Sequence, residues 1–295
     1  MIFINPKTDY AFKKIFGSSE NKDILISFLN ALIYENVDRI EDLEIINPNL
    51  SPKTQGLKDT YLDVKAKLDN GTFVIIEMQV LNVQSFGKRV LYNAAKTYAL
   101  QLKAGEGYRM LKPVIALTIA DFEMFENLDR VISRFSYYEE DTYYRYTDND
   151  LELVFVELPK FTKEIDEIET LTDKWIYFLK YARSLTGVPE TMDSIPEIHR
   201  AFEIANQANL TREELEDLER REMFIYDQQG AIALGREEGR EEGREEGREE
   251  GREEGRQAEK LAMARQSLDR FDDETISQIT GLSLDEVRNL RSSES

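Results

Sequence analysis

The stretch from Lys58 to Val80, KDTYLDVKAKLDNGTFVIIEMQV, places the tightest constraint on what this chain can fold into. Its two halves mostly alternate apolar and polar residues, and Asp69-Asn70-Gly71 between them has the composition of a tight turn. The stretch therefore predicts two antiparallel strands. Residues two apart on a strand share a face, so we expect one face to carry Tyr61, Asp63 and Lys65 and the other to carry Leu62, Val64 and Ala66.

The second strand of this hairpin ends on polar residues. One of its faces carries Phe73, Ile75, Glu77 and Gln79, and the other carries Val74, Ile76, Met78 and Val80. A carboxylate beside an apolar core costs free energy unless something compensates for it, and a divalent metal is a common compensation. Pairing across the turn brings Asp63 near Glu77, and carboxylate oxygens are ligands that Mg²⁺ prefers. The hairpin therefore predicts a metal site shared by these two acids.

The order of motifs resembles a known family. Asp63, a hairpin and Glu77-Met78-Gln79 are similar to the D…ExK signature of the PD-(D/E)XK nuclease superfamily, with Gln79 where lysine usually stands. The opening DYAFKKIFG at residues 9–17 and the segment SFLNAL at residues 27–32 narrow the resemblance to the Rpn recombination-promoting nucleases, also called PD-(D/E)XK transposase-like proteins. The resemblance covers roughly residues 5–160.

This resemblance implies a metal-dependent DNA endonuclease that uses Mg²⁺ or Mn²⁺. It makes Asp63 and Glu77 metal ligands, with the backbone carbonyl of Met78 as a third. Gln79 is a candidate catalytic residue, but a neutral amide can only orient water by hydrogen bonds, so we expect a lower rate than lysine would give. We expect a homodimer, so that both strands of DNA can be cut.

Other polar residues are candidates for the same site. Asp9 and Lys13 match the family's DxxFK opening and share one turn of an expected helix, so Asp9 is a candidate additional acid and Lys13 a phosphate contact. Lys65, on the Asp63 face, is a candidate replacement for the missing lysine, and Gln101 is a candidate supporting group. Lys65 is also a candidate contact for DNA phosphates, together with Lys14, Lys58, Lys88 and Arg89; scattered solvated charge is the alternative.

The net charge of −20 is unusual for a protein that binds DNA until it is divided along the chain. Residues 1–110 contain 14 Lys and Arg and 13 Asp and Glu, so residues 111–295 contain the remaining 24 and 45. The front of the chain is close to neutral and the back is strongly acidic. A basic face for phosphates is therefore compatible with the front alone.

Hydrophobic periodicity predicts an α/β fold with a mixed central sheet flanked by helices, followed by a helical extension. The resemblance implies that the α/β part is a restriction-endonuclease-like PD-(D/E)XK core. Helices are expected at 21–34 and 86–103, the latter with Val90, Leu91, Ala94, Ala95, Tyr98 and Leu102 facing inward. Besides the hairpin, strands are expected at 41–47, 111–120 and 152–158, and the crossover through the long helix suits parallel pairing. Further helices are expected at 171–185, at 197–208 and after the capping box Thr211-x-x-Glu214.

We divide the chain into a nuclease-like domain (1–160), a helical region (161–234), a GREE repeat (235–256) and a small helical hairpin (257–295). The repeat is interpreted either as a charged, partly helical tether with pairs such as Glu237 and Arg240, or as a glycine stripe that lets two helices approach in a homodimer. The tail at 272–291 is interpreted either as a small packing or dimerisation hairpin, with Ile276 and Ile279 on one face, or as a helix-turn-helix that reads DNA. The tyrosines between 137 and 146 either stack on bases or pack beneath a sheet edge.

Composition excludes several other classes. The chain has no cysteine and one histidine, His199, which excludes disulfide frameworks, His-rich metal sites and triads that need a catalytic histidine. No apolar stretch approaches the ~20 residues that cross a bilayer, and the amino terminus lacks the pattern of a signal peptide, so we expect a cytoplasmic protein with no membrane partner. Two rival functions stay open: a regulatory DNA-binding protein that has lost turnover, and an oligomeric interaction protein built on the GREE repeat.

Overall fold

The computed structural model describes residues 1–49, 62–148 and 150–293, and these contain one six-stranded sheet with the order β1-β2-β3-β4-β6-β5. β3, β4 and β6 run parallel in the middle, and the outer pairs are antiparallel. The strands are β1 (Leu43–Ile46), β2 (Val64–Leu68), β3 (Phe73–Gln79), β4 (Val114–Ala120), β5 (Ile132–Phe135) and β6 (Leu151–Glu157). The predicted α/β fold with a mixed central sheet is confirmed.

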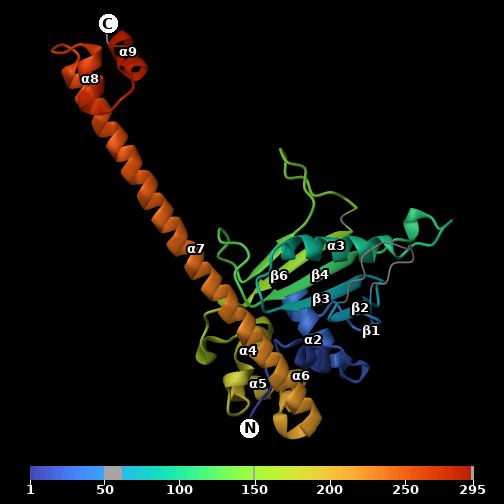
Figure 1. The fold of residues 1–295 in the computed structure, drawn as a ribbon. Coiled ribbons are helices and arrows are strands. Elements are labelled where there is room, and N and C mark those ends of the chain that lie inside the picture. Colours follow the sequence, from blue (N-terminus) through green and yellow to red (C-terminus); the bar gives the residue numbers. More distant parts are fainter. Residues whose placement is uncertain (50–61, 149, 294–295) are drawn as a thin grey trace. The chain divides into compact units, whose positions relative to one another are not determined.

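Helices cover both faces of this sheet (Figure 1). On one face, α3 (Phe86–Ala99) packs through Phe86, Val90 and Ala94 onto side chains that include Ile75 and Phe155. The other face is covered by α1 (Asp9–Phe16), α2 (Lys22–Ile33), α4 (Leu171–Tyr181) and α6 (Pro196–Ala205), with the short α5 (Glu190–Asp193) beside α6. Alternate residues of β3 and β4 divide between the two layers, as the period of a strand requires.

A chain of buried aromatic rings fixes the larger helical layer. Phe16 of α1 lies 4.4 Å from Phe28 of α2, ring centroid to ring centroid, and Phe28 lies edge-on to Trp175 of α4 at 5.6 Å. The series continues through Phe178 to Phe202 of α6, whose centroids are 4.8 Å apart. Each such pair contributes roughly 0.5–1.5 kcal/mol beyond the area it buries. The rings therefore hold α1, and the polar residues it carries, at a fixed place over the sheet.

The hairpin predicted between Lys58 and Val80 is confirmed in its described part. Val64 lies opposite Ile76, and Gly71 at the turn has a φ of 88°, which glycine adopts without strain. The expected face of Leu62 is wrong, because Leu62 packs in the α3 layer while Val64 packs in the opposite layer. The chain bends at Asp63, so regular alternation begins only at Val64.

The predicted inward face of the helix at 86–103 is also wrong in part. The helix ends at Ala99; Leu91 is 47% exposed and Ala95 is exposed, whereas Asn93, Lys96 and Thr97 are buried in their place. The buried face is rotated toward polar residues. The reason is chemical: the sheet surface beneath this part of α3 presents the buried Glu77, which needs polar partners.

Two compact units make up the chain, residues 1–227 and residues 228–295. The helix α7 (Arg212–Ser267) begins in the first, where Thr211 and Glu214 form the predicted capping box. The GREE repeat lies within α7, is helical, and is exposed along its whole length. Within the described chain no ion pair joins its residues, so the expected pair of Glu237 and Arg240 is not formed.

The tail folds into α8 (Asp273–Thr280) and α9 (Leu284–Ser293) against the end of α7. Ile276 is buried as predicted, but Ile279 is 55% exposed and Thr280 is buried instead. Arg291, a possible contact to DNA, donates to the carbonyls of Leu268 and Phe271. These contacts favour the packing hairpin. Among the described residues, no helix is both long and apolar enough to span a membrane.

Candidate functional site

Asp63 immediately precedes β2, at the end of the hairpin that lies away from the turn. Its backbone N–H donates to the carbonyl of Ile76 at 3.2 Å, and its carboxylate accepts from the backbone N–H of Met78 at 2.8 Å. The side chain therefore satisfies a strand donor that the bent backbone of β2 no longer reaches. Because the N–H and C=O of a strand residue leave the same edge, the Met78 carbonyl also points toward the side of Asp63.

Glu77 lies beside Asp63 in the register of the hairpin and is 8% exposed. The Nδ2 of Asn93 donates to its Oε1, and the guanidinium Nε of Arg89 lies 3.5 Å from its Oε2. Both partners come from α3, four residues apart, which places them on one face of that helix. On the other side, Lys13 of α1 lies 3.1 Å from the carboxylate of Asp63. The two acids thus receive cations from opposite layers.

Burial dominates the electrostatics of the two acids. It raises the pKa of Asp63, and the Met78 N–H and the ammonium of Lys13 only partly oppose this. Burial likewise raises the pKa of Glu77, against the Asn93 hydrogen bond and the charge of Arg89, and the negative charge of Asp63 raises it further. The negative charge of Asp63 thus acts on Glu77, while the pKa of Asp63 is raised further by the charge of Asp9. A positive charge added between two such carboxylates would stabilise their ionised forms.

Gln79 and Arg89 form one unit at the end of β3. The side-chain amide of Gln79 donates to the carbonyl of Leu81 at 2.7 Å and accepts from Arg89 at 2.6 Å. Arg89 also stacks on the ring of Phe86, 4.9 Å from its centroid, and its side chain is 43% exposed. Where lysine usually stands, the structure therefore presents a glutamine that holds an arginine between itself and Glu77.

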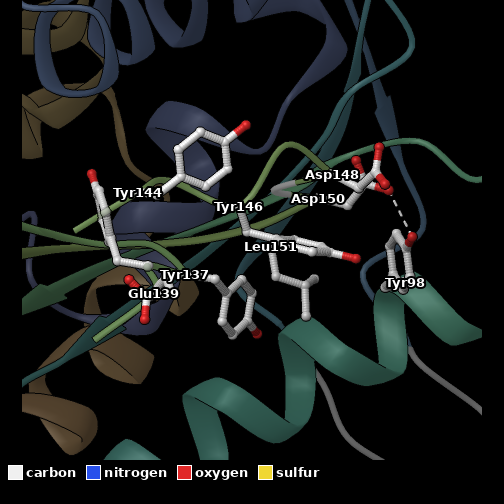
Figure 2. Close-up of a pocket in the computed structure, with 9 residues that line it drawn as sticks. Tyr98, Tyr137, Glu139, Tyr144, Tyr146, Asp148, Asp150 and Leu151 are labelled. Atoms are coloured by element: carbon white, nitrogen blue, oxygen red, sulfur yellow. Dashed lines mark hydrogen bonds between the residues drawn. The ribbon is translucent and has the colours of Figure 1, made fainter. Parts of the chain in front are cut away.

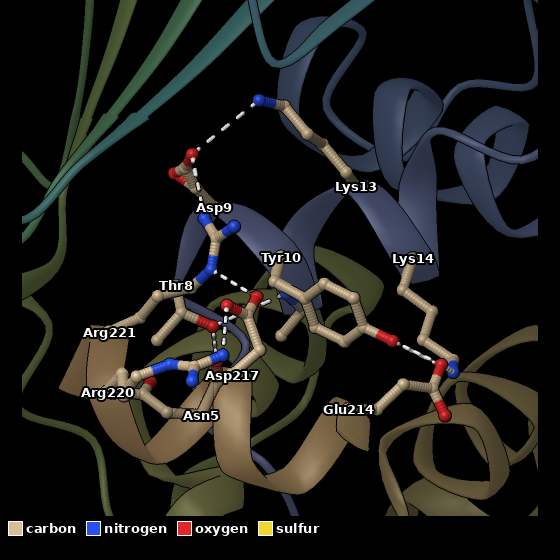
Figure 3. A network of polar contacts seen from close by, with 11 residues as sticks. Asn5, Thr8, Asp9, Tyr10, Lys13, Lys14, Glu214, Asp217, Arg220 and Arg221 are labelled. Atoms are coloured by element: carbon tan, nitrogen blue, oxygen red, sulfur yellow. Dashed lines mark hydrogen bonds and ion pairs between the residues drawn. The ribbon is translucent and has the colours of Figure 1, made fainter. Parts of the chain in front are cut away.

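The predicted residues of α1 lie in a polar network with the start of α7 (Figure 3). Asp9 pairs with Lys13 at 3.7 Å and with Arg221 of α7 at 3.6 Å. Lys14 pairs with Glu214 at 2.5 Å, and Tyr10 donates to the same carboxylate. The two lysines of α1 therefore have different partners: Lys13 pairs with Asp63 and Asp9, and Lys14 is neutralised by Glu214 of α7.

The remaining predicted residues are not brought to the acids. Lys65 is partly buried with its Nζ 5.7 Å from the ring centroid of Phe73, and burial lowers its pKa. Lys88 is exposed on α3, and Lys58 lies outside the described residues. Gln101 follows the end of α3 and is used by the backbone of Lys112, to which it donates at 2.9 Å and from which it accepts at 2.8 Å. It supports the approach to β4 rather than the acids.

Sequence reasoning missed Asn93. It is 1% exposed, its Nδ2 is bound to Glu77, and its Oδ1 has no hydrogen-bond partner among the described residues. A buried amide oxygen without a partner costs free energy unless something occupies it. One sequence pattern could have revealed Asn93: Arg89, Asn93 and Lys96 follow one another at i, i+4 and i+7 and so form a polar stripe along one side of the helix.

The residues at this edge fit a divalent metal by chemistry. Two carboxylates, the Met78 carbonyl and the unpartnered Oδ1 of Asn93 are all oxygen ligands of the kind Mg²⁺ binds. No group of three or more His, Asp and Glu in the described chain forms a metal cluster. A metal here would therefore be coordinated by two carboxylates, neutral oxygens and water. Mg²⁺ usually keeps several water ligands in proteins, so it fits such a site.

The chain is an α/β protein in which a mixed sheet lies between helical layers and two partly desolvated carboxylates lie beside partly exposed cations. The sequence model of the PD-(D/E)XK nuclease family transposases matches residues 6–235, and the chain belongs to this family. The match runs past residue 160 and includes the helices up to α7. No curated protein and no solved structure matched the chain.

Proposed function

We propose that this protein is a metal-dependent DNA endonuclease that hydrolyses phosphodiester bonds. The observation that carries the proposal is the pairing of Asp63 and Glu77 at one edge of the sheet, each with a raised pKa and each facing a cation. Ion pairs that serve only stability seldom keep two like charges together away from water. Membership of a nuclease family supports the same conclusion.

Asp63, Glu77 and the Met78 carbonyl would hold Mg²⁺ or Mn²⁺, with Asn93 as a neutral oxygen beside them. When bound, such a metal makes water a nucleophile near neutral pH and relieves charge on the phosphoryl and leaving oxygens. Asn93 orients Glu77 through its Nδ2, and the Met78 N–H orients Asp63. These hydrogen bonds keep both carboxylates fixed when a substrate arrives.

Arg89 takes the electrostatic role that lysine has elsewhere in the family. Its side chain is partly exposed and stacked on Phe86, so its guanidinium is preorganised to bind a phosphate by two N–H groups. Gln79 is a positioning residue, because both groups of its amide are already used by Leu81 and Arg89. Lys13 is a second phosphate contact, on the other side of Asp63.

Nicking of supercoiled plasmid in Mg²⁺ or Mn²⁺ tests the proposal. We expect cutting by the wild-type protein and loss of cutting by Asp63→Ala and by Glu77→Gln. A folded Asp63→Ala variant that cuts as well as the wild type would rule out the assignment. If neither protein cuts but both bind DNA equally, the rival function is favoured: a regulatory protein that retains the fold without turnover.

We further propose that the enzyme acts as a homodimer, because cutting both strands of a duplex needs two sites. The exposed glycines of the GREE repeat, which recur every fourth residue, support this proposal as a surface where helices can approach closely.

A further inference from the structure

A hollow of about 640 Å³ lies at the opposite end of the parallel strands from Asp63 and Glu77, next to the start of β6. We call it the tyrosine pocket (Figure 2). It is lined by Tyr98, Tyr137, Tyr138, Glu139, Tyr144, Tyr146, Asp148, Asp150 and Leu151. Its volume is within the range of small-molecule sites, roughly 300–1,000 Å³. The candidate nuclease site uses none of these residues.

Hydrogen bonds hold the walls of the pocket in place. The backbone N–H of Glu139 donates to the carbonyl of Tyr144, and that of Tyr146 donates to Tyr137, so the segment is a hairpin. On the facing wall, the hydroxyl of Tyr98 donates to the carboxylate of Asp150 at 2.6 Å, which raises the pKa of Tyr98 to about 12. The pocket is therefore formed before any ligand binds.

The tyrosines of the hairpin keep about half or more of their surface exposed, so packing beneath the sheet edge accounts for only part of each ring. Tyr138, Tyr144 and Tyr146 are 53–62% exposed, which is a large apolar surface to leave in water. Figure 2 shows Tyr137 and Tyr146 beside Leu151, with Tyr144 farther along the hairpin. Exposed aromatic faces that converge on one hollow are a binding surface for a ligand with a matching charge or ring.

The charge of the pocket selects among ligands. Three carboxylates line it, and no Lys or Arg of the described chain does. Hydrogen bonds from Thr142 lower the pKa of Glu139, so this carboxylate stays ionised in mildly acidic solution. The phosphates of a nucleic acid would be repelled. Stacking on DNA bases, one of the two interpretations of these tyrosines, is therefore disfavoured.

We propose that the tyrosine pocket binds an organic cation that carries a trimethylammonium group. The negative face of a tyrosine ring attracts a cation, and quaternary ammonium groups are bound in this way by aromatic cages. Such a group donates no strong hydrogen bond, so it loses little on leaving water for a tyrosine wall, while the carboxylates add attraction at the rim. The group can belong to a free small molecule or to a methylated lysine in a peptide.

Isothermal titration calorimetry on the full chain tests this with choline as the probe and 3,3-dimethylbutan-1-ol, its neutral isostere, as the comparison. We expect choline to bind about tenfold more tightly, a difference of about 1.4 kcal/mol, because only the cation is attracted by the faces of the tyrosine rings. A capped peptide with trimethyllysine forms a second arm; if it binds more tightly than choline, the ligand is a protein side chain. Equal affinity for the neutral isostere, or no binding by either cation, would overturn the proposal.

Matched variants locate the binding site. Tyr146→Ala and Asp148→Asn should each weaken choline binding by at least about fivefold. Tyr143→Ala and Asp141→Asn should not, because these residues belong to the same hairpin but do not line the pocket. Equal losses in all four variants would overturn the assignment to the pocket. Displacement of choline by a single-stranded oligonucleotide would also overturn it, in favour of base stacking.

Discussion

At neutral pH the carboxyl groups of Glu77 and Asp63 are ionised, although their burial in the fold disfavours the charged form. Their raised pKa values mean that the folded protein binds protons more readily than the unfolded chain between the ordinary carboxyl range and the folded values. For such groups the stability is highest when they are protonated and falls as the pH rises through this window. At neutral pH the ionised pair therefore subtracts from the free energy of unfolding.

Glu77→Gln should therefore be more stable than the wild type at pH 7, by about 0.5–2 kcal/mol. Glutamine keeps an oxygen for Asn93 to donate to but carries no charge. The gain should shrink as the pH is lowered toward 4.5, because the wild-type carboxyl then becomes neutral. Urea unfolding at several pH values measures it.

The matched control is Glu126→Gln, at an exposed position. Mg²⁺ should raise the unfolding midpoint of the wild type and not that of Glu77→Gln, since a metal that binds only the folded state stabilises it. A variant that is destabilised at pH 7, or that Mg²⁺ stabilises equally, would contradict this account of the acids.

Arg89 should contribute more to cutting than any other cation of α3. Arg89→Gln is expected to lower the nicking rate about 10²–10³-fold, the usual loss when one preorganised charge stabiliser is removed. Arg109→Gln, at an exposed position outside α3, is the control. Adding Gln79→Lys to Arg89→Gln should restore part of the rate, because it returns a cation to the end of β3. Unchanged cutting by Arg89→Gln would assign the role to another residue.

At the scale of elements, the first turns of α7 are joined to α1 through Glu214. Its carboxylate accepts from Lys14, Tyr10 and Thr211, and these contacts, above all the one from Lys14, lower its pKa to about 2. A lowered pKa gives stability that is present above the ordinary value of 4.5 and is lost as the pH falls toward 2.

Glu214→Gln should therefore be less stable than the wild type at pH 7, by about 1 kcal/mol, the central value for a hydrogen bond. The difference should disappear between pH 4.5 and 2. Glu213→Gln, one residue away with an exposed side chain, should leave stability unchanged. A difference that persists at low pH would mean that packing, and not charge, joins the two helices.

Helices and strands were predicted best from the sequence where a single hydrophobic period, helical or strand-like, dominates the segment. The helix at 22–33 buries the expected apolar stripe, and the hairpin and the apolar strand at 114–120 follow from alternation, turn chemistry and a continuous apolar run. β5 was missed because ISRF is short and has neither alternation nor an apolar run. Its pairing with β6 depends on a neighbour that no local pattern reveals.

For the candidate site, the sequence proposed Asp63, Glu77 and Gln79, and it named Lys13 and Arg89 only as contacts to phosphate. It did not pair these cations with the acids, and it missed Asn93. Which residue of α3 approaches a carboxylate depends on the rotation of the helix about its axis, and the face that carries Asn93 is not the predicted apolar stripe. Apolar periodicity favoured Leu91 and Ala95, whereas the unsatisfied charge of Glu77 selects Arg89 and Asn93. A buried acid is a tertiary constraint and overrides a local pattern.

At the scale of the whole molecule, the chain separates its charges along the sequence. The candidate site lies within residues 1–227, while the GREE repeat and its flanks make up the second compact unit. The repeat places two glutamates against one arginine in every four residues, so it is acidic without a partner for its excess charge. It should not bind DNA, and its role is to be sought in contacts between proteins.

Substitutions in the GREE helix can test whether the protein forms a dimer through this repeat. Its six glycines each cost about 0.5–1 kcal/mol relative to alanine, yet the helix is continuous through residues 235–256, where every side chain is exposed. Nothing lies within 4 Å of where a Cβ would stand at these glycines, so alanine fits the single chain. Replacing the glycines at 239, 243, 247 and 251 by alanine should therefore strengthen an isolated helix.

The same change should weaken a dimer in which glycines let two helices approach, because four methyl groups then separate the backbones. We expect the wild type to sediment as a dimer, the alanine variant to dissociate at higher concentration, and deletion of residues 235–256 to give a monomer. Analytical ultracentrifugation measures the mass, and circular dichroism checks that helix content rises in the alanine variant. A deletion variant that is still a dimer would leave the repeat as a tether. The two sites needed to cut a duplex would then have to be brought together by residues 1–227.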